Sequence, residues 1–429
     1  MEWYPSYKPS GVKWLGEIPS HWEMKRWRFL MSENTTKNTN CKERLQLQFR
    51  YGDIVRKANQ SEESDVLDTI SKYTVVEPDD IMINGLNLNY DFISQRVAQV
   101  QERGVITSAY ISLRPTEIAN SRYFTYFLKS MDAKKMFHGM GTGIRLTLSY
   151  NELKNQFIPC PSPDEQSAIA AYLDTATAKI DAAIAQQQKM IDLLNERKQI
   201  IINRAVTKGL NPNAKMKESG VEWIGEVPEG WEVRRLKHLL KANLMYGANE
   251  SAESEVESYP RYIRITDIDE DGKLRPDTFR SLPPAKAEPY LLKKGDLLFA
   301  RSGATAGKTY LFNENIKACF AGYLIKASLK ETLLPEYLNY YTKSGIYANW
   351  KKSIFIQATI PNIGAEKYAN LQITLPSIKE QEDIVKHLDV ETGKINQVVR
   401  NCEKQISLLQ ERKQIIINEV VTGKVKVTN

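Results

Sequence analysis

The stretch GATAGKT, Gly303 to Thr309, has the residue types of a phosphate-binding loop, in which backbone amides and a lysine surround phosphate groups. Such a loop needs four residues between its first glycine and its Gly-Lys pair. Three stand here, and Ser302 occupies the position of the required glycine. A strand-turn-strand with a polar, cationic tip therefore fits better than a nucleotide site, and an exposed hairpin without a ligand is the plain alternative. The donors at this tip are Arg301, Ser302, Thr305 and Lys308.

A second glycine-rich stretch, GMGTGIR from Gly139 to Arg145, follows a predicted helix. A dinucleotide fingerprint instead follows a strand and opens a helix, so a mobile loop carrying His138 and Arg145 is expected. The corresponding stretch later in the chain is SIFIQATIPNIG, which carries a different set of polar side chains. This difference is what two readers of different sequences would show.

Asparagine can pair with adenine, and arginine with guanine, through two hydrogen bonds in the DNA major groove. Each such residue is also a common phosphate contact, turn former or uninvolved surface residue, so the prediction concerns the set. The candidate DNA-binding residues are Asn84, Asn87, Asn89, Arg96, His138, Arg145, Arg264, Arg301, Ser302, Thr305, Lys308, Lys351, Lys352, Gln357 and Asn362. The net charge of +7 permits a polyanionic partner without requiring one.

Catalytic motifs are not found in the sequence. The four histidines are dispersed, and there is no HExxH pattern, nucleophile elbow, helicase motif or adenine-methyltransferase motif. The four cysteines, Cys41, Cys160, Cys319 and Cys402, stand singly, which argues against a metal site or disulfide framework and fits a reducing compartment. No uncharged apolar run approaches the roughly 18 to 20 residues that span a bilayer, and no signal peptide begins the chain. We expect a cytoplasmic protein without a catalytic site, metal or cofactor of its own.

The chain is an internal duplication. Ile158–Gly209 and Ile373–Lys424 share 25 identities in 52 positions, including the repeated word ERKQIIIN. The block GVKWLGEIPSHWEMKRWRFL from Gly11 recurs from Gly220 as GVEWIGEVPEGWEVRRLKHL, with 10 identities in 20. Between these blocks the two copies have diverged, and short alternating runs mixed with aromatic-rich helices predict α/β bodies. Each unit therefore reads as a fixed opening, a variable body and a fixed tail. The tryptophans of the opening block are interpreted as packing residues at the start of each domain and not as an active site.

Each fixed tail predicts a long helix. Ser162 and Ser377 precede glutamates in S-x-x-E capping boxes, and Gly209 and Gly423 mark the expected ends. Apolar residues recur with a period of 3.5, which predicts a coiled-coil seam, and about 45 residues at 1.5 Å each give a rod of roughly 65 Å. The predicted seam residues are Leu173, Ile180, Ile184, Ile191, Leu194, Ile201, Leu388, Ile395, Val399, Ile406, Leu409 and Ile416.

ERKQIIIN places three consecutive isoleucines on each helix, and neighbouring helix positions are about 100° apart. One isoleucine of each copy fits the seam. We interpret the other two as candidate contacts with a partner that both copies share, and the alternative is that they are ordinary helix positions. These partner-contact candidates are Ile200, Ile202, Ile415 and Ile417.

Taken in order, the repeated opening block, the tails IPCPSPDEQSAIAAYLD and ITLPSIKEQEDIVKHLD, and the words LLNERKQIIIN and LLQERKQIIIN resemble the specificity subunits of type I restriction-modification enzymes. The resemblance covers essentially the whole chain. It implies two target-recognition domains, at 1–160 and 211–375, and two antiparallel spacer helices, at 161–210 and 376–429. It also implies a bacterial or archaeal source and a role in host defence.

In this family each recognition domain reads half of an asymmetric bipartite DNA site. The resemblance implies as partners double-stranded DNA, two modification subunits that methylate adenine, and restriction subunits that translocate DNA. S-adenosylmethionine, ATP and Mg are then expected on those partner subunits only. A pseudo-twofold relation between the units would present one domain to each DNA strand, with half-sites about one turn, roughly 34 Å, apart. Two rival hypotheses remain open, namely a nucleotide-dependent enzyme built on GATAGKT and a coiled-coil scaffold that reads no DNA.

Overall fold

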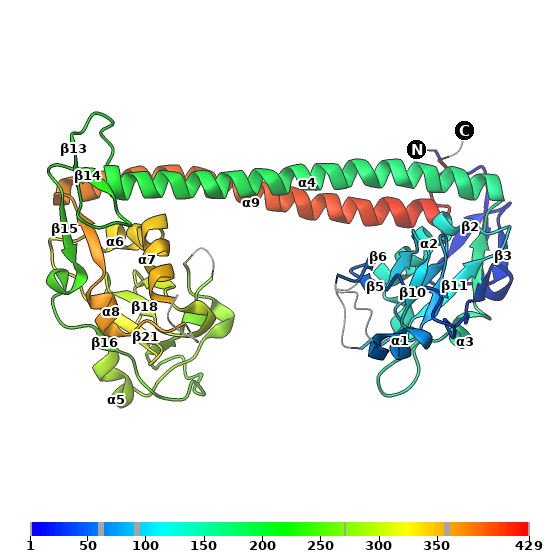
Figure 1. Cartoon of the computed structure of the whole chain (residues 1–429), viewed down its shortest axis with the longest axis horizontal. Helices are drawn as coiled ribbons and strands as arrows, with labels where there is room; N and C mark the ends of the chain where they lie inside the picture. The colour runs from blue at the N-terminus through cyan, green and yellow to red at the C-terminus, as the bar shows by residue number, and fades with distance from the viewer. Residues whose placement is uncertain (1, 59–63, 90–94, 270–271, 356–360, 428–429) are drawn as a thin grey trace. The chain divides into compact units, whose positions relative to one another are not determined.

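The structure, a computed structural model, describes residues 2–58, 64–89, 95–269, 272–355 and 361–427. The chain divides into two compact units, which we describe separately: unit 1 is Met1–Gln188 with Glu403–Asn429, and unit 2 is Lys189–Cys402. Two long helices, α4 (Pro163–Lys208) and α9 (Ile378–Val421), contribute one segment each to both units (Figure 1). The predicted class, mixed α/β bodies with two long helices, is confirmed.

Unit 1 is built on a four-stranded antiparallel sheet in the order β4-β11-β8-β9, against which α2 packs. The Asn120 side chain begins α2 by accepting a hydrogen bond from the Tyr123 backbone amide at 3.0 Å. The strands of unit 1 are β1 (Tyr7–Pro9), β2 (Glu17–Pro19), β3 (Glu23–Arg26), β4 (Met31–Glu33), β5 (Leu47–Arg50), β6 (Asp53–Arg56), β7 (Thr74–Val76), β8 (Ile81–Ile83), β9 (Val97–Gln99), β10 (Gly104–Ile106), β11 (Ile111–Pro115) and β12 (Phe157–Cys160). Its shorter helices are α1 (Ser64–Ser71), α2 (Ser121–Ala133) and α3 (Tyr150–Leu153).

Unit 2 has an equivalent four-stranded antiparallel sheet in the order β16-β21-β18-β19, beside a parallel pair formed by β17 and β20. Its strands are β13 (Met216–Glu218), β14 (Glu226–Pro228), β15 (Glu232–Arg235), β16 (Met245–Tyr246), β17 (Arg261–Ile263), β18 (Leu297–Ala300), β19 (Thr309–Leu311), β20 (Ala318–Phe320), β21 (Leu324–Ala327) and β22 (Gln372–Leu375). Its shorter helices are α5 (Pro284–Ala287), α6 (Pro335–Tyr341), α7 (Gly345–Phe355) and α8 (Ala365–Ala369).

The long helices begin and end where the sequence predicts. The Ser162 and Ser377 hydroxyls each accept a hydrogen bond from the backbone amide three residues later, at 3.3 Å. Glu165 does not complete the capping box by the expected route, because its carboxylate accepts from the Tyr4 hydroxyl at 2.7 Å and lies 3.0 Å from His21 Nε2. Gly209 and Gly423 stand just past the helix ends with φ of 69° and 73°, the left-handed conformation that favours glycine there.

The repeated opening block packs against these glycines. A Cβ at position 423 would lie 2.3 Å from Pro19 Cδ and 3.0 Å from the Trp22 ring, and a Cβ at 209 would lie 3.1 Å from the Trp231 ring. Both tryptophans are buried. The opening block is therefore a packing element that closes on a helix end, as its repetition indicated.

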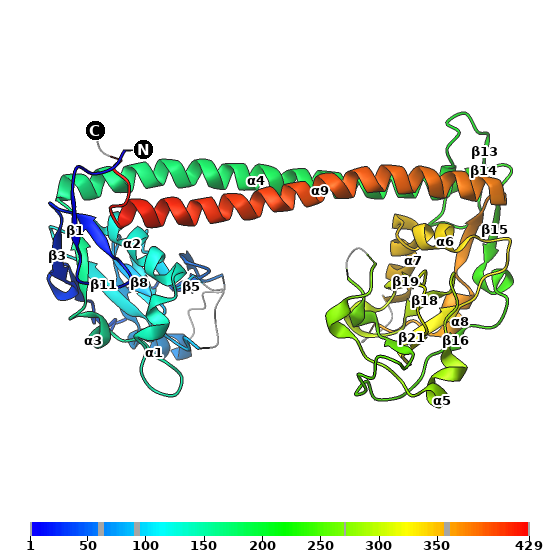
Figure 2. The ribbon, with the colours of Figure 1, turned by 180° about the vertical axis from the view of Figure 1, so that it is seen from behind.

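Within each unit the segments of α4 and α9 lie side by side and antiparallel (Figure 2). In unit 1 the Lys413 ammonium contacts both carboxylate oxygens of Asp181, at 2.7 and 2.8 Å. In unit 2 the Lys198 ammonium donates to the Asn396 side-chain oxygen at 3.0 Å. The two contacts are related by the duplication, because 181 and 396, like 198 and 413, are the same positions of the repeat.

The twelve predicted seam residues are all buried or half-buried, whereas several apolar residues on other helix faces are exposed. Leu173 and Leu388 lie in the two main hydrophobic cores together with residues of the variable bodies. They therefore anchor each body to its helices. The burial of the remaining ten is the pattern that a helix-helix seam requires.

Candidate nucleic-acid interface

Arg96 was predicted to contact DNA, and the structure contradicts that prediction. Its side chain is 1% exposed, and its guanidinium donates to the backbone oxygens of Asn84, Leu86 and Asn87 at 3.0, 2.8 and 3.3 Å. A guanidinium has five donors in a fixed fork, which suits it to gathering several carbonyls of one loop. Arg96 therefore holds the loop that follows β8.

The three asparagines of that loop are placed differently from one another. Asn87 is exposed, with φ of 51°, while Asn84 and Asn89 are half-buried. The Asn84 side chain accepts from the Leu86 amide at 3.2 Å, and the Asn89 side chain donates to the Ile144 carbonyl at 3.3 Å. The last bond ties this loop to the glycine-rich loop, so the structure brings two predicted stretches together.

A hollow of about 530 Å³ lies beside Asn84. The tip of the β5–β6 hairpin supplies Arg50 and Tyr51, and the Tyr51 side chain is 75% exposed. Such a set of amide, guanidinium and aromatic groups is suited to base edges and stacking. The sequence analysis missed this hairpin, although the dipeptide Tyr51-Gly52 between two alternating runs was a turn signal. The lining residues are Gln48, Phe49, Arg50, Tyr51, Asn84 and Gln95.

The glycine-rich loop carries one of its two predicted side chains at the surface. Arg145 is exposed, and Ile144 beside it is 96% exposed, at the end of a turn closed by a bridge between Thr142 and Thr147. His138, in contrast, has both ring nitrogens buried. Arg145 is therefore available to a ligand, whereas His138 belongs to the packing of the loop.

GATAGKT does not have the geometry of a nucleotide-binding loop. Gly303–Thr305 forms a short 3-10 turn, and the chain continues into strand β19, so the loop does not open a helix as a phosphate-binding loop does. The Lys308 ammonium donates to the Ile268 carbonyl at 3.1 Å. The predicted strand-turn-strand with a polar tip is confirmed.

Three predicted residues of unit 2 meet at one edge of this turn. Ser302 and Asn362 form an isolated β-bridge, and the Ile363 amide donates to the Arg301 carbonyl at 2.8 Å. The Arg301 guanidinium carbon lies 5.2 Å from the Tyr246 ring centroid, a cation–π distance. Asn362 is exposed. Gln357, predicted in the same stretch, lies outside the described residues.

The other predicted cations of unit 2 differ in their availability. Lys352 is exposed, and Lys351 is half-buried against Gly307, with the burial lowering its pKa. The Arg264 guanidinium donates to both Asp267 oxygens, at 3.1 and 2.6 Å, and to the Thr278 carbonyl at 3.1 Å. The hydrogen bond to Asp267 raises the pKa of Arg264. Arg264 therefore has a structural role, and because its side chain is 32% exposed its prediction as a DNA contact stays a prediction.

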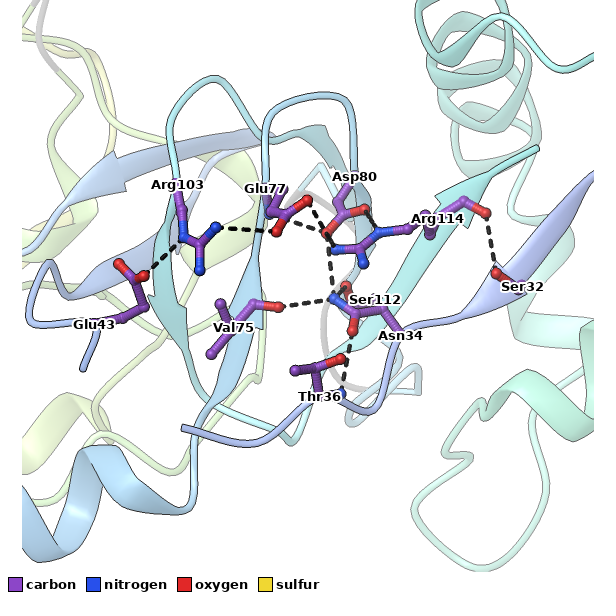
Figure 3. Close-up of polar contacts among 10 residues, drawn as sticks. All are labelled: Ser32, Asn34, Thr36, Glu43, Val75, Glu77, Asp80, Arg103, Ser112 and Arg114. Atoms are coloured by element: carbon purple, nitrogen blue, oxygen red, sulfur yellow. Dashed lines mark hydrogen bonds and ion pairs between the residues drawn. The ribbon is translucent and has the colours of Figure 1, made fainter. Parts of the chain in front are cut away.

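The group of charged and polar side chains drawn in Figure 3 is likewise structural. Asp80 is 2% exposed, and Arg114 donates to both of its oxygens at 2.9 and 2.8 Å. Asn34 donates to the same carboxylate at 3.2 Å and to the Val75 carbonyl at 2.8 Å (Figure 3). The Asp80 hydrogen bond raises the pKa of Arg114. These contacts join the segments around β7, β8 and β11, and therefore position the loops at their ends.

The isoleucines of ERKQIIIN fall on three surfaces. Ile202 and Ile417 are 2% and 3% exposed, within the cores of units 2 and 1. Their prediction as partner contacts is wrong, because this face of each helix already packs on a body of the same chain. Ile200 and Ile415 are 59% and 47% exposed, so they remain partner-contact candidates.

A repeated pair missed by the sequence analysis lies one heptad earlier, at Leu193 and Leu408, which are 51% and 46% exposed. Each leucine stands seven residues before an exposed isoleucine, so each helix carries the same two apolar residues on one outward stripe. The repeated letters LL before ERKQIIIN were the available signal. Only the tertiary structure shows that the first leucine of each LL dipeptide is exposed.

Among the described residues, no group of three or more His, Cys, Asp or Glu side chains is placed to hold a metal ion. Within that same part of the chain, no helix is long and apolar enough to cross a membrane.

Comparison with known proteins places these features in one family. The sequence model described as "Type I restriction modification DNA specificity domain" matches residues 56–191 and 228–404, one region in each repeat. The chain is 25% identical over 374 residues to the type I restriction enzyme MjaVIII specificity subunit of Methanocaldococcus jannaschii, covering 84% of this chain and 82% of that protein. It is 22% identical over 326 residues to the EcoKI specificity subunit of Escherichia coli K12, covering 72% and 67%.

A chain of a solved structure is also similar. It was reported as "Structural basis underlying complex assembly and conformational transition of the type I R-M system", and it aligns with a TM-score of 0.71 at 16% identity, covering 95% of this chain and 99% of that one. At that identity the likeness concerns the fold. Since the family model matches well over half of the sequence, in both repeats, the chain belongs to the DNA specificity subunits of type I restriction-modification systems.

Proposed function

We propose that each unit reads one half of an asymmetric bipartite DNA site, and that the chain delivers adenine-methyltransferase subunits to that site without catalytic activity of its own. The observation that carries the proposal is the contrast between the repeats. The helical tails make the same contacts in both units, whereas the polar loops of the bodies carry different side chains. Two units with the same helix contacts but different polar loops are suited to two different DNA half-sites.

The equivalence of the frames extends to single hydrogen bonds. The Gln166 side chain donates to the Ile118 and Pro161 carbonyls at 3.1 and 2.9 Å. Gln381 donates to the Thr332 and Pro376 carbonyls at 3.0 and 3.0 Å. Both glutamines are fully buried, so each helix holds its body in the same way. Tyr126 and Tyr340 likewise donate to Asp174 and Asp389. Asn203 and Asn418 each accept a hydrogen bond from the body, from the Ile346 amide and the Ser130 hydroxyl respectively.

The reading surface of unit 1 comprises the loop after β8, the β5–β6 hairpin tip and Arg145. In unit 2 it comprises Arg301, Ser302, Thr305, Lys308, Asn362 and the exposed Lys352 of α7. S-adenosylmethionine, ATP and Mg would bind the partner subunits, in keeping with the expectation that this chain has no cofactor. The target adenine would be flipped from the stack by the modification subunit, which requires DNA held in a fixed register.

Exchange of residues 31–157 for the body of another specificity subunit is expected to change one half of the methylated motif and leave the other half as it was. The physical reason is that the body supplies the base-contacting loops while the helices supply the frame. Adenine methylation mapped across the genome, with and without the gene and with the exchanged gene, measures this. A scaffold that reads no DNA predicts the same methylome for the original and the exchanged gene, and that result would sink the proposal. A methylome that does not depend on the gene would also contradict it.

The outward stripe of each helix is proposed to dock one modification subunit, because the same exposed apolar residues stand in both units, as a shared partner would require. Ile200→Asp and Ile415→Asp are each expected to weaken one docking site by about 2–4 kcal/mol, the range of an interface hot spot. The double variant should then lose both partners. Subunit stoichiometry after co-purification measures the effect.

Val390→Asp is the matched control, since Val390 is 50% exposed on α9 and its repeat position in the other helix holds Thr175. It should leave the stoichiometry unchanged. Retention of two modification subunits by the Ile200/Ile415 double variant would remove these residues from the docking surface.

A further inference from the structure

Unit 2 contains a hollow of about 710 Å³ where the helices meet the body. The lysines that line it come from α4, the turn before β19, the loop after α6, and α7. Among the described residues around it, the one carboxylate is Asp269. The lining lysines are Lys198, Lys308, Lys343 and Lys351.

Three of these ammonium groups contact neutral groups. Lys198 donates to the Asn396 amide oxygen at 3.0 Å, and Lys308 donates to the Ile268 carbonyl at 3.1 Å. Lys351 lies over the Tyr347 ring, with its Nζ 5.2 Å from the centroid. Hydrogen bonds and ring contacts of this kind orient the ammonium groups but do not cancel their charge.

The position of Lys351 in the hollow is electrostatically unfavourable for its charged ammonium group. Its side chain covers Gly307, where an added Cβ would lie 2.2 Å from Lys351 Cδ, so the glycine is what lets the lysine enter the hollow. Burial lowers the pKa of Lys351, because desolvation disfavours the charged ammonium. An anion in the hollow would supply the missing countercharge.

Unit 1 repeats two of these four lysines, and one of the two contacts a carboxylate. Lys413 occupies the repeat position of Lys198, and Lys129, in YFLKS, that of Lys343, in YYTKS. Lys413 is held by both oxygens of Asp181, at the position where unit 2 has Asn396. Desolvation lowers the pKa of Lys129, while Asp53 and Asp181 act on that pKa in the opposite direction. Lys413 therefore has a carboxylate partner at the place where Lys198 has the Asn396 amide.

We propose that the hollow of unit 2 binds the phosphate backbone of DNA, and that Asp181 suppresses the equivalent site in unit 1, so that the two halves of the bound duplex are held unequally by their phosphates. The inference rests on the proposed DNA-reading function and adds to it a source of affinity that carries no base specificity. The shared chemistry is phosphate, which DNA, a free nucleotide or inorganic pyrophosphate could each supply.

The test is a reciprocal exchange of one amide and one carboxylate in the full chain, purified with the subunits that accompany it. Asn396→Asp gives Lys198 the partner that Lys413 has. This change should weaken duplex binding by about five- to tenfold near 0.1 M salt and reduce the slope of log affinity against log salt by about 1, as expected for one lost phosphate contact. Asp181→Asn should change both quantities in the opposite direction.

Gln397→Asp is the matched control, because it adds the same charge at the next, exposed position of α9. Lys351→Met, which keeps an apolar stem over Gly307, is an independent variant and should lower the salt slope as Asn396→Asp does. Duplexes with and without the methylated motif should be weakened alike, since a phosphate contact is blind to sequence. The methylated motif itself should not change.

Three results would overturn the inference. The first is an equal effect of Asn396→Asp and Gln397→Asp, and the second is an unchanged salt slope in both Asn396→Asp and Lys351→Met. The third is binding of ATP or pyrophosphate that the substitutions weaken while duplex binding stays intact. The last result would assign the hollow to a free phosphate compound. These outcomes leave the methylome unaffected, whereas failure of the proposed function would appear as a methylome that does not depend on the gene.

Discussion

Arg96→Ala is expected to lower the free energy of unfolding of unit 1 by about 3–5 kcal/mol, because it leaves three loop carbonyls without their donor and opens a cavity in a packed region. The variant should also lose recognition of the half-site read by unit 1, since Arg96 holds the loop that carries Asn84, Asn87 and Asn89. Arg96→Lys should recover little, because one ammonium cannot reproduce the fork of a guanidinium.

Hydrogen exchange in β8 and β9 measures this effect better than a single melting curve, since a chain of two units need not unfold in one step. Arg145→Ala is the matched comparison. Arg145 is exposed, so its loss should leave the exchange rates unchanged while weakening binding of the methylated duplex by about 1–3 kcal/mol. Normal stability of Arg96→Ala together with weakened binding would instead make Arg96 a DNA contact.

Gln166→Ala and Gln381→Ala are expected to destabilise their own units by similar amounts, about 2–4 kcal/mol each, because each leaves two buried carbonyls and one backbone amide without partners. The amides are those of Asn120 and Leu334, which donate to the glutamine oxygens at 2.7 and 2.8 Å. Loss of this anchor should loosen the body from its helix before the helix itself unfolds.

The readout is hydrogen exchange in the first turns of α4 and α9, compared between the two variants. Ser167→Ala and Glu382→Ala, at exposed neighbouring positions, should change little. A large effect of Gln166→Ala with none for Gln381→Ala would contradict the equivalence of the two frames.

Most of the frame could be predicted from the sequence. Repetition of Ser162, Gly209 and the apolar period is local information, since a cap, a left-handed stop and a helix face depend on residues a few positions apart. The bounds of α4 and α9 agree with these signals. The mixed α/β character of the bodies was also predicted, because alternating apolar runs are visible without knowledge of their partners.

The functional surface was predicted less well, and Arg96 shows why. A side chain's chemistry is visible in the sequence, but whether its donors face solvent depends on segments far away along the chain. Arg96 and Arg264 donate to acceptors within their own units, whereas Arg145 is exposed. The same uncertainty separated Ile202, which a body covers, from Ile200, which is exposed.

The sequence by itself determined the duplication, the two long helices, the α/β bodies and the family, because these depend on patterns that repeat within one chain. Only the tertiary structure decided which polar residues are accessible and which carboxylates face the repeated lysines. Asp181 has a carboxylate where Asn396 has an amide, and the effect of that difference depends on the ammonium group that each side chain contacts. That contact joins residues some 200 positions apart, and no local pattern specifies it.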